Sequence, residues 1–352
     1  MQYRSMNLTN MTVLLILVIV SLSTSYWSAM ENPQGFMDPA WRSGWLQNFS
    51  TETFGAIATF LLFEIVVGNQ QRRREEERYR DEAIRRIIRE MRSSNEHEGQ
   101  RAIEEAREMG ILVDGTLMGA ILRGAHLNGA NLREANLFGA DMRQTKLQKA
   151  DLYDTILTQA QLAEADLHSA DLRKADLFAA RLYDADLTET LLEMATLTRA
   201  NLWNATLTRA ELGEANLSGA TLRNATLADV NSRMANYTDT NLQGATLTGA
   251  FLWKSNLSGA NLCNASLRNA NLLDVIFSKE TVLPDAVNTG TDDTPTYSKH
   301  WSPGADMARY TDPQHPDFWQ PQWAMAGYGS YREWYYAGKP DEPSSPEDTI
   351  DD

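Results

Sequence analysis

Residues 160–187 read AQLAEADLHSADLRKADLFAARLYDADL, and a leucine stands at every fifth position of this stretch. The same frame runs without insertion from Leu112 to Phe277, with Met142 and Phe277 in place of leucine and an interruption at Ser232 and Tyr237. The residue two positions before each leucine is usually alanine. A period of five fits neither the 3.6-residue period of an α-helix nor the two-residue period of a strand.

The period predicts an all-β solenoid, in which each five-residue unit makes one side and one corner of a four-sided coil. Every fifth side chain then points to the axis together with the small residue two positions before it, and the other three positions face outward. Successive coils stack at the strand spacing of about 4.8 Å. We therefore expect a packed axis, with its core represented by Leu132, Leu152, Leu172, Leu202, Leu222 and Leu262.

The motif A-(D/N)-L-x-x, as in Ala130–Leu132, Ala165–Leu167 and Ala260–Leu262, resembles the pentapeptide-repeat family. The resemblance covers about residues 110–280 and implies a right-handed quadrilateral β-helix. The flanking segments resemble a membrane-anchored bacterial subgroup with two N-terminal transmembrane helices. This second resemblance rests on Asn48–Glu52 before the second apolar segment and on Thr281–Asp285 with Trp301–Pro303 in the tail.

Two apolar segments, at about 8–27 and 45–67, are long enough to cross the hydrocarbon core as helices. Arg72, Arg73 and Arg74 follow the second segment, and positive charge marks the cytoplasmic side of a span. The pattern predicts an α-helical membrane hairpin over 1–68 in the inner membrane, with the β-helix facing the cytoplasm. A cleaved signal peptide stays open as the alternative for the first segment, because Arg4 and the apolar run 11–22 are typical of one.

A helical neck is predicted over 69–109. Its first part carries one apolar stripe at helical spacing, made of Ile84, Ile87, Ile88 and Met91. This stripe either dimerises the chain as a coiled coil or lies on the membrane or on the rod. Asn95 and Glu98 resemble a capping box that begins a second helix. We expect this second helix to cap the rod, since the end of a solenoid exposes apolar side chains.

The repeat is irregular at Ser232 and Tyr237, which occupy consecutive inward positions. Serine leaves space and a hydroxyl to satisfy, whereas tyrosine is too large for a leucine slot. The two residues predict a local bulge or bend near 229–240. This irregularity is either a tolerated defect or a recognition site.

The tail, 281–352, is acidic, rich in aromatic residues and expected to be partly disordered. Its residues account for −9 of the formal net charge of −15. Its aromatic residues either cap the C-terminal end of the rod or bind a partner protein. The candidates for partner contact are Trp319, Trp323, Trp334 and Tyr335.

No catalytic, cofactor-binding or metal-binding residue is predicted, and no cofactor. The five histidines have no metal-ligand spacing, and no phosphate-binding loop is present. Cys263 is the only cysteine, so no intramolecular disulfide can form, and its position in the repeat points it outward. No segment has the excess of lysine and arginine that nucleic-acid binding requires.

The sequence thus favours a non-catalytic, membrane-tethered scaffold for protein–protein interaction. Its expected partners are the membrane and an unidentified protein, with a homodimer through the neck helix as a further alternative. A second function follows from the resemblance, because some family members mimic DNA and bind topoisomerases. The near balance of charge in the rod, about −4 over 111–280, speaks against that role. An enzyme of unknown type is the third alternative.

Overall fold

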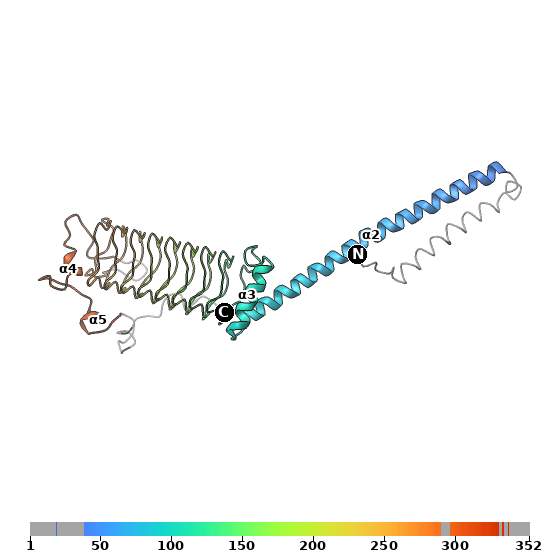
Figure 1. Cartoon of the computed structure of the whole chain (residues 1–352). Coiled ribbons are helices and arrows are strands. Elements are labelled where there is room, and N and C mark those ends of the chain that lie inside the picture. Colours follow the sequence, from blue (N-terminus) through green and yellow to red (C-terminus); the bar gives the residue numbers. More distant parts are fainter. Residues whose placement is uncertain (1–18, 20–38, 290–295, 331–332, 334–336, 338–352) are drawn as a thin grey trace. The chain divides into compact units, whose positions relative to one another are not determined.

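The computed structural model describes residue 19, residues 39–289 and 296–330, and residues 333 and 337; the side chains of 39–54 and 56–65 are not described. The helices are α2 (Pro39–Met91), α3 (Glu96–Glu108), α4 (Ala308–Thr311) and α5 (Gln322–Met325). The chain divides into two compact units, Met1–Ala83 and Ile84–Asp352. Figure 1 shows the stacked coils of the second unit.

Helix α2 runs without interruption from Pro39, so the segment predicted as the second span and the first part of the neck belong to one helix. Its 53 residues correspond to about 80 Å at 1.5 Å per residue. Within the described residues, no helix is both long and apolar enough to cross a membrane. The predicted first span, 8–27, lies outside the described residues apart from Ile19, and most side chains of 45–67 do too.

The rod is a β-helix with four units per coil. Single-residue parallel bridges join residues 20 apart, from Ile121 with Asp141 to Asn256 with Ile276. In each unit the backbone N–H of the inward residue donates to a carbonyl of the next coil, as from Leu132 to Asp151 at 2.7 Å. The next coil donates back, as from the Asp151 N–H to the Ala130 carbonyl at 2.9 Å.

Each corner is a tight turn in which the residue two positions after the leucine has a left-handed backbone. Its φ lies between +53° and +61° where the residue is not glycine, as at Glu134 (+58°) and Lys174 (+60°), and between +62° and +70° where it is glycine. The turn closes with a hydrogen bond from the next small residue to the leucine carbonyl, for example from Ala135 to Leu132 at 3.1 Å. Four such corners per coil turn a repeat of five into a square.

Leucine and alanine fill the axis, as the spacing predicts. Most inward leucines and small residues between Leu117 and Leu267 are 0–2% exposed. Where threonine replaces the small residue, its hydroxyl donates to a leucine carbonyl of the preceding coil, as from Thr155 to Leu132 at 2.9 Å. An inward threonine hydroxyl is therefore hydrogen-bonded to the backbone, and its burial costs little free energy.

Helix α3 covers the N-terminal end of the rod. The Asn95 side chain accepts from the His97 N–H at 3.1 Å, which caps the helix, while Glu98 accepts from the Ser93 hydroxyl at 2.7 Å instead of closing a capping box. Ala102, Ile103 and Ala106 are buried in the core that continues into the first coil. Gln100 donates to the Asn128 carbonyl at 2.6 Å and ties α3 to that coil.

The apolar stripe at the end of α2 belongs to the same core. Ile87 and Met91 are fully buried, with 0% of their surface exposed. Ile84 and Ile88 are partly buried and pack against the same core. This stripe is therefore used within the chain, as expected for a neck helix that lies on the rod. The physical reason is the end of the solenoid, which needs more apolar cover than α3 alone supplies.

The C-terminal end of the rod is closed by residues 281–330. Val282 adds to the last coil through a bridge to Asn261, one residue out of the 20-residue register, and pairs on its other side with His300 in antiparallel fashion. Phe277 stacks on Trp301 with ring centroids 5.8 Å apart, and Trp319 meets the edge of Tyr310 at 6.0 Å. The described part of the tail is thus a cap.

The bulge predicted near 229–240 is wrong. The coil keeps its bridges and corner turns through this region, with φ of +54°, +58° and +57° at Asp229, Met234 and Asp239. Ser232 and Tyr237 are both fully buried, and their hydroxyl oxygens lie 2.6 Å apart. The small serine leaves the space that the large tyrosine of the next unit occupies, and each hydroxyl satisfies the other. The pair compensates in volume and in polarity, so the backbone does not deform.

Candidate functional site

The outward side chains of the rod form four flat faces, because only the inward residues reach the axis. We name the faces by their inward residues: face A follows Leu112, Leu132 and so on to Leu272; face B follows Leu117 to Phe277; face C follows Leu122 to Leu262; and face D follows Leu127 to Leu267. Faces A and C are opposite sides of the square. Each face carries columns of side chains that repeat every 20 residues.

The four faces differ in charge. Face A has nine acidic and five basic residues, face B two of each and face D four of each. Face C alone has an excess of cations, with Arg123, Arg143, Arg181 and Arg223 against three carboxylates. The net charge of the rod is small, although face A is acidic and the opposite face, C, is weakly basic.

Face A carries a cluster around Tyr153. The Arg133 guanidinium lies 4.3 Å from the centre of the Tyr153 ring, and the Lys174 ammonium lies 5.3 Å from it. Arg173 is tied to Asp171 by two hydrogen bonds of 2.9 and 2.6 Å, which lower the pKa of that carboxyl. The cluster presents a rigid aromatic surface edged by charges.

Face C carries aromatic and guanidinium groups on neighbouring coils. Tyr183 and Trp203 stand in one column and are half-buried, while Arg181 is exposed. Arg143 binds Asp141 through two hydrogen bonds of 2.8 Å, which lower the pKa of the Asp141 carboxyl. Tryptophan, tyrosine and arginine are the residues that most often dominate protein interfaces.

Face B is nearly uncharged and apolar at its N-terminal end. Met118 is 51% and Ile156 39% exposed, and the half-buried Phe138 and Phe178 stand beside them. Its C-terminal half is lined by Thr, Asn and Ser. The side chains of face B do not point toward a common centre. The face therefore provides a flat contact surface and no pocket.

The aromatic residues of the tail that were predicted to contact a partner lie in different environments. Trp323 is 3% exposed and its indole N–H donates to the Asn264 carbonyl at 3.3 Å, so this predicted contact residue packs within the chain. Trp319 is half-buried and packs against the rod core. Trp334 and Tyr335 lie outside the described residues. Trp319 and Trp323 pack against the rod because the end of the solenoid needs an apolar cover, which the tail supplies.

Cys263 does not point into solvent as predicted. It is 2% exposed, its thiol donates to the Ala286 carbonyl at 3.1 Å, and burial raises its pKa to about 11. The position is outward in the repeat, but the cap strand around Val282 lies over it. A thiol with this pKa is protonated at neutral pH and is a poor nucleophile.

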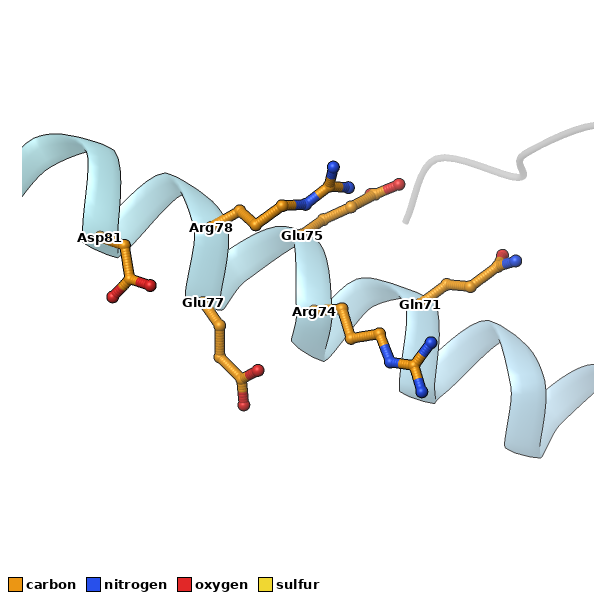
Figure 2. Close-up of a pocket in the computed structure, with 6 residues that line it drawn as sticks. All are labelled: Gln71, Arg74, Glu75, Glu77, Arg78 and Asp81. Atoms are coloured by element: carbon orange, nitrogen blue, oxygen red, sulfur yellow. The ribbon is translucent and has the colours of Figure 1, made fainter.

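Among the described residues, no three His, Cys, Asp or Glu side chains are grouped as metal ligands. His168 lies 3.8 Å from Glu189 and His315 lies 3.0 Å from Asp306, and each of these contacts joins a histidine to a single carboxylate. On α2, Figure 2 shows polar and charged side chains on successive turns of one exposed helix, among them Arg74, Glu77 and Asp81. A single helix encloses no site that could hold a substrate.

The model of the family described as pentapeptide repeats matches residues 117–154, 155–193, 195–231 and 240–278. HetL of Nostoc, a pentapeptide repeat protein involved in the regulation of heterocyst differentiation, is 34% identical over 48% of this chain and 85% of HetL, with a TM-score of 0.21. The chain belongs to the pentapeptide-repeat family. Membership implies that the coil is a right-handed β-helix.

Two further solved members of the pentapeptide-repeat family are similar to this chain. Rfr23 of the cyanobacterium Cyanothece is 22% identical over 49% of this chain and 98% of Rfr23, with a TM-score of 0.16. QnrB1, a plasmid-mediated fluoroquinolone resistance protein, is 16% identical over 46% of this chain and 85% of that chain, with a TM-score of 0.38. No curated protein matches the chain.

Proposed function

We propose that this pentapeptide-repeat protein is a non-catalytic scaffold, tethered to the inner membrane, whose rod binds a partner protein on its cytoplasmic side. The observation that carries the proposal is the filled axis, in which the inward leucines are almost wholly inaccessible to solvent. Chemistry needs a concave site with converging groups, whereas flat faces suit recognition by surface.

The tether rests on the sequence of the N-terminal part. The apolar segments 8–27 and 45–67 have the length of membrane spans, and three arginines follow the second one. Membrane fractions washed with high salt and then extracted with detergent test this assignment. We expect the full chain to leave the membrane only with detergent. Release by salt alone would show that the chain is not integral.

The orientation has its own test. If the rod faces the cytoplasm, protease added to intact spheroplasts leaves it uncut, and cleavage occurs only after lysis. Cleavage in intact spheroplasts contradicts the cytoplasmic placement. A detectable loss of about 20–27 N-terminal residues in the mature protein would instead support the signal-peptide alternative.

The partner-binding face can be found with four matched variants on one coil, one for each face. They are Arg233→Glu on face A, Thr238→Glu on face B, Gln243→Glu on face C and Thr248→Glu on face D. Proximity labelling with the full chain first identifies candidate partners. We expect one variant to lose the partner and the other three to keep it. Equal retention by all four means that the faces of this coil do not bind it.

A topoisomerase partner is the second candidate function, and the resistance protein QnrB1 gives the reason to test it. The acidic residues of face A are the surface on which such binding would depend. Inhibition of gyrase supercoiling by the purified chain supports this candidate, and normal supercoiling at a large molar excess of the chain excludes it.

A further inference from the structure

The C-terminal cap leaves one corner of the last coil partly open. At the end of faces C and D, the inward Leu262 and Leu267 are 0% and 2% exposed. At the end of faces A and B, the inward Leu272, Val275 and Phe277 are only half-buried. The axis of the rod therefore reaches solvent at the corner between faces A and B.

The same corner carries backbone groups that no further coil uses. In the coils before it, each inward N–H donates to the next coil, and the carbonyl of each small inward residue accepts from it. Within the described part of the chain, the N–H groups of Leu272 and Phe277 and the carbonyl groups of Ala270 and Val275 have no such partner. A β edge with free N–H and carbonyl groups is a template for pairing with another chain.

Outward side chains around this corner are apolar as well, over the last three coils. Met234, Phe251, Leu273 and Ile276 are each 39–61% exposed. At about 200 Å² for a whole large apolar residue, they present about 400 Å² of apolar surface, an area that marks interaction sites. We call these four outward residues and the three half-buried inward residues the A/B corner. Two such surfaces bury about 1,000 Å² when they meet, about the minimum for a specific protein interface.

The charges around the A/B corner select a partner of the same kind. Lys254 and Lys279 stand at its rim against Asp274 and Glu280, and all four are exposed. A rim with equal numbers of both signs is complementary to a copy of itself. A strongly acidic or basic protein, or an anionic lipid surface, would meet as much repulsion as attraction there.

The other end of the rod is closed, which limits how two copies can meet. The inward Leu112 and Leu117 of the first coil are 1% and 0% exposed. The open coil end of one chain is therefore matched only by the same end of another. We propose that two copies of the chain associate through their A/B corners, each covering the open end of the other. Contact between two equal surfaces has two-fold symmetry and closes at a dimer.

The oligomeric state of the purified full chain tests this proposal, which does not rest on the membrane tether or on the identity of a partner. We expect a dimer in sedimentation velocity at micromolar concentration. Leu273→Asp with Ile276→Asp places two carboxylates in the contact and should raise the dissociation constant at least about tenfold. Both side chains are exposed in the single chain, so the rod should keep its circular dichroism and thermal unfolding.

The matched control is Met118→Asp with Ile121→Asp at the other end of the rod. These two residues hold the same two repeat positions on either side of a corner and are 51% and 55% exposed. The control should remain a dimer. A dimer held together by the neck helix would survive both pairs of substitutions, so the comparison separates the two arrangements.

A crosslinking experiment locates the contact. Leu273→Cys and Met118→Cys are each introduced into the full chain and treated with a short bismaleimide; Cys263 is buried and reacts slowly. We expect crosslinks between two chains at least about fivefold more often at position 273, because a two-fold axis brings equal residues together. A chain that stays monomeric at high micromolar concentration, a dimer that the substitutions at 273 and 276 leave intact, an equal loss in the control, or equal crosslinking at both positions would each overturn the proposal.

Discussion

At the scale of single residues, the rod accepts departures from its repeat when a neighbour compensates for them. Ser232 and Tyr237 show this most clearly, because the volume missing at one inward position is used by the next, and their hydroxyl oxygens are 2.6 Å apart. Burial raises the pKa of Tyr237, so the pair stays uncharged inside the core. The threonines of the axis follow the same rule with a backbone carbonyl as the partner.

The Ser232 and Tyr237 pair predicts strong coupling between two substitutions. Ser232→Leu overpacks against the tyrosine and Tyr237→Leu leaves a cavity and an unpaired serine hydroxyl, so each destabilises the rod by about 2–3 kcal/mol. The double variant restores two ordinary leucine units and should be more stable than either single variant. Urea unfolding of all four proteins measures the coupling, expected at about 2 kcal/mol or more. Additive effects would show that the two side chains do not share one space.

The left-handed corner residues predict stabilising substitutions. Met194 is 54% exposed with φ of +61°, so its side chain contributes little packing while its backbone is strained. Met194→Gly removes that strain, and after the larger entropy loss of glycine the net gain is about 0.5–1 kcal/mol. Met194→Ala is the control, since it shortens the side chain without relieving the backbone, and should change stability by less than about 0.5 kcal/mol. Equal effects of Gly and Ala in thermal unfolding would contradict this account.

At the scale of the coil, stability comes from stacking identical corners on one another. Each corner must fit the corner of the neighbouring coil 20 residues away, so a side chain is tolerated only where that neighbour leaves room. A Cβ added at Gly249 meets the Asp229 carboxylate at 2.2 Å, whereas a Cβ added at Gly124 meets nothing within 4 Å. Both glycines have φ near +70°.

These two glycines separate backbone strain from steric conflict. Gly124→Ala should cost about 1 kcal/mol, because only the left-handed conformation is penalised. Gly249→Ala should cost about 1–2 kcal/mol more, since Asp229 must also move. Denaturant unfolding of the two variants gives the difference directly. If Gly249→Ala is no worse than Gly124→Ala, the carboxylate of Asp229 moves away freely and coil-to-coil fit is not limiting there.

At the scale of the whole molecule, the rod is a repeat that must be closed at both ends. Helix α3 and the end of α2 close the first coil with apolar side chains, and residues 281–330 close the last coil. The second cap is held by an ionic cluster around Asp285, whose side chain is 5% exposed. Tyr310 donates to this carboxylate at 2.8 Å, Arg309 lies 3.2 Å from it and Lys299 also binds it.

The Asp285 cluster predicts that the C-terminal cap is lost in acid. Burial alone would raise the pKa of Asp285, but the hydrogen bonds from Lys299 and Tyr310 outweigh it and the pKa is lowered. A carboxyl with a lowered folded-state pKa stabilises fully above its ordinary value of about 4 and loses that contribution as the pH falls through the lower value. We therefore expect limited proteolysis within 286–320 to increase below about pH 4, with little change between pH 5 and 7.

Substitution of the same residue isolates this contribution. Asp285→Asn keeps the shape of the side chain but removes the charge that pairs with Lys299 and Arg309, whose side chains are 48% and 37% exposed. The substitution should therefore destabilise the cap by about 1–2 kcal/mol and make it cleavable at pH 7. Its cleavage should then depend less on acid than that of the natural chain. Asp306→Asn, at a 60% exposed carboxylate paired only with His315, is the matched control and should leave the cap intact. Acid sensitivity unchanged in Asp285→Asn would assign it to other groups.

The sequence by itself determined the square β-helix, its limits and its filled axis, because a strict period of five leaves one large and one small inward residue in every unit. It also placed the end-capping helix at Asn95, since capping chemistry and apolar spacing are local. It could not show that Ser232 and Tyr237 fit together, that Cys263 is covered, or that Trp323 is buried. Each of these depends on contacts between residues that are adjacent only after the chain has coiled, where volume and hydrogen bonding are shared between neighbours that no local pattern links. The charge of the four faces is likewise a property of the coil, because residues 20 apart in the chain become neighbours only when the square closes.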